Sequence, residues 1–314
     1  MSKTSDDQFI GGFAYRSDTV TMFIRNRQHW LAALLLWASA CISTHIPQPK
    51  SPPDNRPVEP TPLPSAPPRK GQWSIRYGEQ SVTYRITRTA TVQRSDSTAD
   101  RENSTNLTRE KVTLTVPPGD TTGFRVSAIA DSFVTTAQGR LGGAAPTQLP
   151  IEVSAILSDS GLTVPAVGGD TICSPTASVI SADLHNLLLP LPSRLSSGLR
   201  WQDSTQLRGC QGGILTTSRT TRTFTAIGEV VFENEPAVEI EENDSTTADG
   251  QGLQQQHQIS LIANGTGRST YLVHAITGHV LQLRRTQTLN ISIKAEGKET
   301  RFVQTVEQEF DAVP

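Results

Sequence analysis

From Gly71 onward, apolar and polar residues alternate along most of the chain. A period of two is typical of antiparallel strands that place one face on a core and the other in water. Turn residues separate the alternating segments, and about ten to twelve strands are expected. Residues 271–306 are expected to form a three-stranded meander. The clearest alternating segments are Val82–Val92, Val112–Val116, Phe124–Ala128, Ile151–Leu157 and Leu283–Ile293.

One stretch has the spacing of a helix instead. Ser174 is a capping residue and Pro175 suits a first helical turn, and the apolar residues after them recur about every 3.6 positions. The pattern predicts a helix from about Pro175 to Leu189 that ends before Pro190. Its leucine stripe must be buried, and the concave face of the sheet is the available surface. We therefore expect a mainly β fold: a large curved antiparallel sheet or half-open barrel with one helix packed on it.

The segment that starts at Met22 reads MFIRNRQHWLAALLLWASAC, with two arginines, a short apolar stretch, small residues and then Cys41. It resembles the signal peptide of bacterial lipoproteins, whose lipobox is Leu-Ala/Ser-Gly/Ala-Cys, although Ala38 stands at the first position. The resemblance implies cleavage between Ala40 and Cys41, lipidation of Cys41 and anchoring to a membrane. The alternative is a plain secretory signal, or an uncleaved anchor, in which the cysteine is incidental.

These features divide the chain into four parts. Residues 1–21 carry a net charge of −1, from two basic and three acidic residues, and are expected to be a disordered extension that precedes a true start at Met22. Residues 22–40 are the signal peptide. Residues 41–70 hold the lipidated cysteine and a disordered tether, because the proline-rich stretch Pro47–Pro68 disfavours helix and sheet. Residues 71–314 form the antiparallel β domain.

Composition and motifs exclude several classes of function. The net charge of −2 and a pI of about 6.3 argue against nucleic acid as a partner. No apolar stretch approaches the roughly 20 residues of a membrane-spanning helix. The chain contains no GxSxG, P-loop, GxGxxG or HExxH motif. We therefore expect a non-enzymatic protein without catalytic residues, metal ligands or a cofactor.

Three side-chain clusters have alternative interpretations. Cys173 and Cys210 bracket the expected helix and are predicted to form a disulfide in an oxidising compartment, with a redox or metal pair as the alternative. His274 and His279 flank a turn and are interpreted as solvated hairpin side chains rather than a metal pair. An acidic segment without Lys or Arg is interpreted as a solvated hairpin that resists edge pairing, rather than a calcium site. Its members are Glu229, Glu233, Glu235, Glu239, Glu241, Glu242, Asp244 and Asp249.

A second resemblance concerns the body. The segment Leu189–Pro192, followed by Gly198 and Trp201, and the later Gly278–Leu281, are similar to an "LP…G…W" pattern of uncharacterised bacterial envelope β proteins. The resemblance implies an envelope compartment and no particular site. Ile42, where an Asp would favour retention at the inner membrane, favours the outer membrane facing the periplasm. The inner membrane and the cell surface are the alternatives.

Three functions are open at this point. The first is a lipid-anchored envelope protein with a structural or binding role, whose partner is another envelope protein or a hydrophobic ligand. The second is a carrier of lipid or another apolar ligand, resembling the LolA/LolB kind of half-barrel, with Leu184, Leu187 and Leu188 as candidate ligand contacts. The third is an envelope hydrolase that uses His185.

Overall fold

A computed structural model describes residues 69–95, 103–117, 124–138, 149–158, 161–163, 175–211, 214–254 and 257–313. Within these residues the chain forms one helix, α1 (Pro175–Leu187), and thirteen strands. The strands are β1 (Gln72–Trp73), β2 (Gln80–Arg94), β3 (Asn103–Val116), β4 (Phe124–Gln138), β5 (Ile151–Ser158), β6 (Gly161–Thr163), β7 (Leu195–Ser196), β8 (Arg200–Gln211), β9 (Ile214–Phe232), β10 (Glu235–Gln254), β11 (His257–His274), β12 (Val280–Ala295) and β13 (Lys298–Val313).

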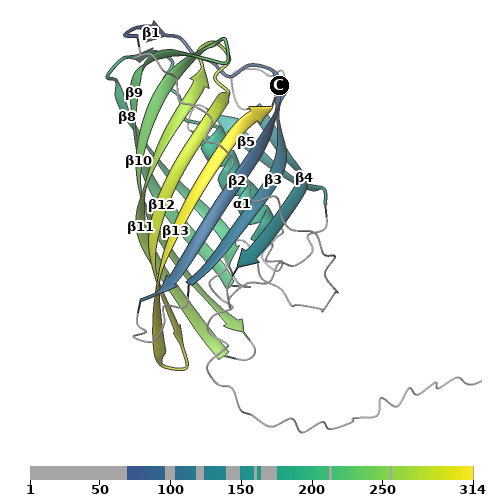
Figure 1. Cartoon of the computed structure of the whole chain (residues 1–314), viewed down its shortest axis with the longest axis vertical. Coiled ribbons are helices and arrows are strands. Elements are labelled where there is room, and N and C mark those ends of the chain that lie inside the picture. Colours follow the sequence, from purple (N-terminus) through teal and green to yellow (C-terminus); the bar gives the residue numbers. More distant parts are fainter. Residues whose placement is uncertain are drawn as a thin grey trace, which may run out of the picture. The chain divides into compact units, whose positions relative to one another are not determined.

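Eleven of these strands form one antiparallel sheet in the order β6-β5-β4-β3-β2-β13-β12-β11-β10-β9-β8. Two meanders, β2 to β6 and β8 to β13, are therefore joined where the first long strand pairs with the last. That pairing runs from Thr83, opposite Val313, to Arg94, opposite Phe302. Ten antiparallel strands of the sheet curl through 251° into a half-barrel (Figure 1). The expectation of a large curved antiparallel sheet is confirmed.

Alternation of side chains gives the half-barrel a dry concave face. In β2, Tyr84, Ile86, Arg88, Ala90 and Val92 are buried, whereas the residues that alternate with them are exposed or half-buried. β12 repeats the pattern over 16 residues. Because neighbouring side chains on a strand point to opposite faces, the buried set of each strand lines the inside of the curve. β11, β12 and β13 are consecutive neighbours, so the expected meander over residues 271–306 is confirmed, with longer strands.

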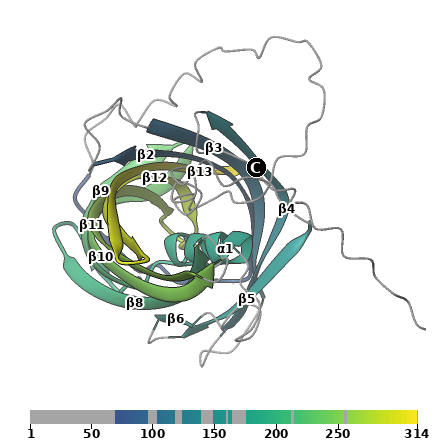
Figure 2. The same cartoon turned by 90° about the horizontal axis from the view of Figure 1, so that it is seen from below.

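α1 lies inside the curve, near β5 and β8 (Figure 2). It connects the two meanders, because it follows β6 in the chain and precedes β8. It ends at Leu187, two residues before the expected end, and the Leu188 N–H donates to the Leu184 carbonyl at 2.9 Å. A Cβ atom at Gly209 of β8 would stand 3.4 Å from the Ser178 Cβ, so the missing side chain allows the helix and strand to approach closely.

Two apolar clusters fill the concave side. The helix-end core contains the leucines of α1 together with Tyr84, Phe224 and Tyr271. The far-end core gathers at the other ends of the strands and includes Ile259, Ile293 and Phe302. Between them the inward positions carry buried polar and charged side chains, among them Arg88, Glu110, Arg222, Glu242, Asp244 and Arg285. This polar belt positions the candidate site.

Candidate functional site

Three buried arginines reach from the sheet toward α1. Arg88 on β2, Arg222 on β9 and Arg285 on β12 are 7 %, 3 % and 9 % exposed. Each occupies an inward position in an alternating strand, as Arg88 does between Ile86 and Ala90. We call them the clamp arginines, because each one donates a hydrogen bond to the last two turns of α1.

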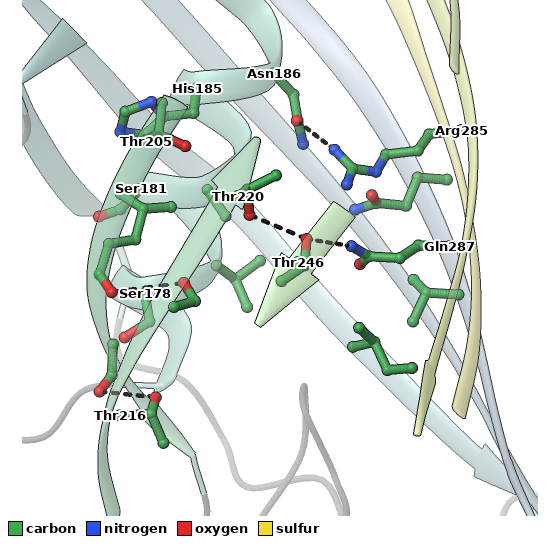
Figure 3. A pocket seen from close by; sticks show the side chains of 18 of the residues that line it. Ser178, Ser181, His185, Asn186, Thr205, Thr216, Thr220, Thr246, Arg285 and Gln287 are labelled. Atoms are coloured by element: carbon green, nitrogen blue, oxygen red, sulfur yellow. Dashed lines mark hydrogen bonds between the residues drawn. The ribbon is translucent and has the colours of Figure 1, made fainter. Parts of the chain in front are cut away.

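The clamp contacts fall on three helix residues within one turn, Asp183, His185 and Asn186. The helix dipole and the unpaired carbonyls of a last turn favour cationic donors at this end. The carbonyl of His185 is such a group, so Arg222 satisfies a helix end that is buried beneath the sheet. Figure 3 shows the contact from Asn186 to Arg285. The three bonds are Arg88 Nη2 to Asp183 Oδ1 at 2.7 Å, Arg222 Nη1 to the His185 carbonyl oxygen at 2.8 Å and Arg285 Nη1 to Asn186 Oδ1 at 2.9 Å.

A carboxylate on the sheet holds each clamp arginine in place. Arg88 Nη1 donates to Glu110 Oε1 at 2.9 Å, and Arg285 Nη2 donates to Asp244 Oδ2 at 2.8 Å. Arg222 Nη2 forms the third ion pair, with Asp203. Charge-assisted bonds of this kind fix the plane of a guanidinium group. The three groups are therefore oriented before any ligand arrives.

The Arg88 contacts perturb two carboxyl groups. Burial, and then the charge of Asp183, raise the pKa of Glu110 to about 8 against the opposing effect of Arg88. Burial also raises the pKa of Asp183, although Arg88 opposes the shift. Two carboxyl groups that share one guanidinium in a dry site do not both ionise readily, so the pair retains a proton near neutral pH. Burial by itself lowers the pKa of Arg88, but the Coulombic attraction of Asp183 and Glu110 outweighs it, so Arg88 stays charged.

A cavity of about 170 Å³ lies between α1 and strands β2, β8, β9, β10, β12 and β13. Its wall includes the clamp arginines, Arg208 and a set of hydroxyl and amide side chains. A chain of hydrogen bonds runs along this wall from Thr220 through Thr246 to Gln287, with distances of 3.0 and 3.1 Å (Figure 3). No Asp or Glu of the described residues lines the cavity. The carboxylates that hold the arginines are therefore outside its wall.

Several buried polar atoms of the wall have no hydrogen-bond partner among the described residues. They are Nε of Arg222, Nε of Arg285 and both ring nitrogens of His185. Burial, and then the charge of Arg222, lower the pKa of His185 to about 4, so its ring is neutral at pH 7. An unmet buried donor costs about 1–3 kcal/mol. The residues of the cavity wall therefore carry buried polar groups whose hydrogen-bonding capacity is unmet by the described residues.

The predicted ligand contacts Leu184, Leu187 and Leu188 are 0–2 % exposed and belong to the helix-end core. None of the three lines the cavity. The face of α1 that does line it carries Ser178, Ser181, Ala182 and His185. Contact between the three leucines and a ligand stays a prediction.

The cysteine predictions lie largely outside the described residues. Ala40, Cys41 and Cys173 are not among them. The backbone of Cys210 belongs to β8 and pairs with Leu215 of β9. Lipidation, cleavage and the disulfide stay predictions.

The two histidines are less solvated than their interpretation as hairpin side chains expected. His274 and His279 are half-buried, and their rings stack with centroids 5.1 Å apart. The Thr277 hydroxyl lies 2.7 Å from Nδ1 of each ring. A hydroxyl and a stacking contact therefore hold the pair. In the described part of the chain, no group of three or more His, Cys, Asp or Glu residues is arranged to hold a metal ion.

The acidic segment is also less exposed than expected. Glu242 and Asp244 are 1 % and 5 % exposed, because they occupy inward positions of β10. β10 lies between β9 and β11, so it is an internal strand and needs no charge to block edge pairing. Asp244 pairs with Arg285, and Glu242 accepts a hydrogen bond from the Tyr271 hydroxyl at 2.5 Å. The solvated interpretation holds for Glu233, Glu235, Glu241 and Asp249, which are exposed.

Comparisons of the sequence with protein families and with curated proteins identify no relative. The chain matches no model of a known protein family, and no curated protein matches its sequence significantly. No helix of the described segments is long and apolar enough to cross a membrane. The fold and the cavity therefore define the class that the structure supports: an antiparallel half-barrel with one internal helix and a polar cavity beside that helix.

Proposed function

We propose that this chain is a lipid-anchored protein of the bacterial envelope whose half-barrel binds a small molecule in the cavity beside α1. The observation that carries the binding role is the set of buried polar atoms without partners in the cavity wall, at Arg222, Arg285 and His185. An empty cavity is normally apolar, whereas a polar one holds water or a bound molecule. The lipobox resemblance at Cys41 supports the anchor, and the outer membrane facing the periplasm is the proposed location.

The side chains around His185 favour binding over catalysis. A hydrolytic serine needs a base within hydrogen-bond distance, and that base is normally oriented by a third group. Ser181, one turn before His185, donates its hydroxyl to the Ala177 carbonyl at 2.8 Å. Neither ring nitrogen of His185 contacts a carboxylate. These contacts support a non-enzymatic role.

A carrier of lipid or another apolar ligand is the second candidate, and the half-barrel is compatible with it. Such a carrier needs a deep apolar pocket, typically of about 300–1,000 Å³. The cavity measures about 170 Å³, and the leucine stripe of α1 is packed in the helix-end core. A whole lipid would therefore have to displace α1 from the sheet.

Two experiments test the proposal. The full-length protein and its Cys41→Ala variant are labelled with a fatty acid in a bacterial host, and the mature N-terminus is identified by mass spectrometry. Label on the wild type alone, with an N-terminal Cys41, supports the anchor, whereas unlabelled wild type with an intact N-terminus contradicts it.

For the binding role, the protein is purified from envelopes and its bound small molecules are measured by native mass spectrometry. The comparison protein is the variant Ala90→Leu, whose larger side chain fills part of the cavity. A stoichiometric small molecule on the wild type that is lost in the variant supports binding. A phospholipid retained by both proteins supports the carrier function instead.

A further inference from the structure

We infer that the cavity binds a small amphiphilic oxyanion, such as a short-chain carboxylate, with its charged group near Arg222 and Arg285. This inference rests on the proposed binding function and adds the chemical class of the ligand. It follows from the charge of the wall, the donors that the wall residues leave unmet, the aliphatic remainder of the lining and the size of the cavity.

The first argument is charge. Four arginines line the cavity, and no Asp or Glu of the described residues does. Three of them are paired with carboxylates outside the wall, and Arg208 is exposed and forms no ion pair with a described residue. The Glu110–Asp183 pair retains a proton near neutral pH. Among the described residues that line the cavity, the four guanidinium groups are thus not accompanied by any carboxylate, which favours an anion over a cation in contact with the wall.

The second argument is the kind of hydrogen-bonding group that the wall residues leave unmet. A guanidinium group has five N–H donors and no acceptor. In Arg222 and in Arg285, one Nη group donates to α1 and the other donates to a carboxylate of the sheet. The Nε group of each arginine has no partner among the described residues. The complement of two fixed donors is an acceptor, and an oxyanion offers several lone pairs. The neutral ring of His185 can add a donor or an acceptor on the same wall.

The third argument is the apolar part of the wall. Aliphatic side chains complete the lining, and no phenyl, phenol or indole ring contributes to it. A short alkyl chain suits such a surface better than an aromatic ligand, which gains from stacking on a ring. The aliphatic set consists of Ala90, Val179, Ala182, Leu207, Leu289 and Val306.

Size completes the assignment. The cavity volume of about 170 Å³ is below the roughly 300–1,000 Å³ of typical ligand pockets, so its ligand must be small. A short-chain carboxylate fits this space, whereas a phospholipid or a long fatty acid does not. The plainest probe is hexanoate, with 1-hexanol and hexylammonium as neutral and cationic molecules of the same length.

The test is calorimetric titration of the full-length protein in detergent at pH 7.5, with detergent alone as the baseline. Hexanoate is expected to bind at least about tenfold more tightly than 1-hexanol or hexylammonium, a difference of about 1.4 kcal/mol. Inorganic phosphate is the fourth probe, and it is expected to bind at least about tenfold more weakly than hexanoate, because it leaves the aliphatic wall uncovered.

Two variants locate the site. Ala90→Leu fills the aliphatic wall and is expected to weaken hexanoate at least about tenfold, while Thr91→Leu, the next β2 residue on the opposite face, leaves it within about twofold. Arg208→Gln removes a wall charge without leaving a buried partner unpaired, so the fold is preserved. It is expected to weaken hexanoate about threefold and to leave 1-hexanol unchanged.

The outcomes separate the inference from the proposed function. If 1-hexanol binds as tightly as hexanoate and Ala90→Leu abolishes both, the cavity is a binding site and the anionic assignment is overturned. Phosphate that binds as tightly as hexanoate overturns the amphiphilic part. If no probe binds to the folded protein, the cavity holds ordered water only, and both the inference and the proposed binding role fail.

Discussion

The buried Glu110 carboxyl should make the protein less stable as the solution becomes alkaline. Burial raises its pKa to about 8 in the folded protein, from an ordinary value of 4.5. The folded state therefore binds a proton that the unfolded state has lost, and the stability from this group declines as the pH rises from about 4.5 to about 8. At about 1.4 kcal/mol per pH unit, the decline between pH 6.5 and 8 amounts to about 2 kcal/mol.

This window isolates Glu110 from His185. The pKa of His185 is lowered to about 4, so its contribution increases with pH only up to about pH 6.5. Urea unfolding followed by circular dichroism at pH 6.5, 7, 7.5 and 8 measures the free energy of unfolding. Glu110→Gln keeps an acceptor for Arg88 and should abolish the decline, whereas Glu152→Gln, at an exposed position of β5, should retain it. A wild-type free energy that stays constant across this range, or a Glu110→Gln protein with the same decline, would refute the reasoning.

Three further changes test the packing of the half-barrel, each by urea unfolding. Arg285→Met leaves Asp244 buried and unpaired and should cost about 3–5 kcal/mol. The double variant Arg285→Met/Asp244→Leu should recover a large part of the lost free energy of unfolding. If it recovers none, the loss does not come from an unpaired Asp244 charge. Leu184→Ala opens a cavity in the helix-end core and should cost about 2–5 kcal/mol, so a cost below about 1 kcal/mol would contradict the burial of this leucine. Gly267→Ala places a methyl group against the Asp244 carboxylate and should lower stability; an unchanged free energy of unfolding would argue against this close contact.

The fold was predictable from the sequence because one physical signal dominates it. The sheet is wet on one face and dry on the other, so polar and apolar residues alternate along almost every strand, as they do in β2. The helix was predictable because Pro175 and the leucine spacing break that period. The pairing of β2 with β13 was not predictable, because residues 83–94 and 302–313 are brought together by the closure of two meanders and not by a local turn.

The site was missed although the sequence contains a signal for it. Arg88 is in phase with Ile86 and Ala90, and Arg285 is in phase with Leu283 and Leu289. A charged residue at an inward position of an alternating strand must find a partner in the core. The sequence does not reveal which partner, because Glu110 and Asp244 come from other strands and Asp183 from the helix. The near-neutral net charge of the whole chain also gives no sign that the cavity is lined by four arginines and by no Asp or Glu of the described residues.

The polar belt also bears on the choice between a small ligand and a lipid. Replacement of a buried ion pair by apolar residues is often neutral or stabilising, so stability alone does not explain three such pairs in one layer. Here each arginine bonds both a strand carboxylate and α1, which fixes the rotation and depth of the helix. The same belt separates the helix-end core from the far-end core. A long acyl chain that reached from one core to the other would have to pass these charged side chains and remove their hydrogen-bond partners. A short amphiphilic anion would instead place its charged group against the arginines.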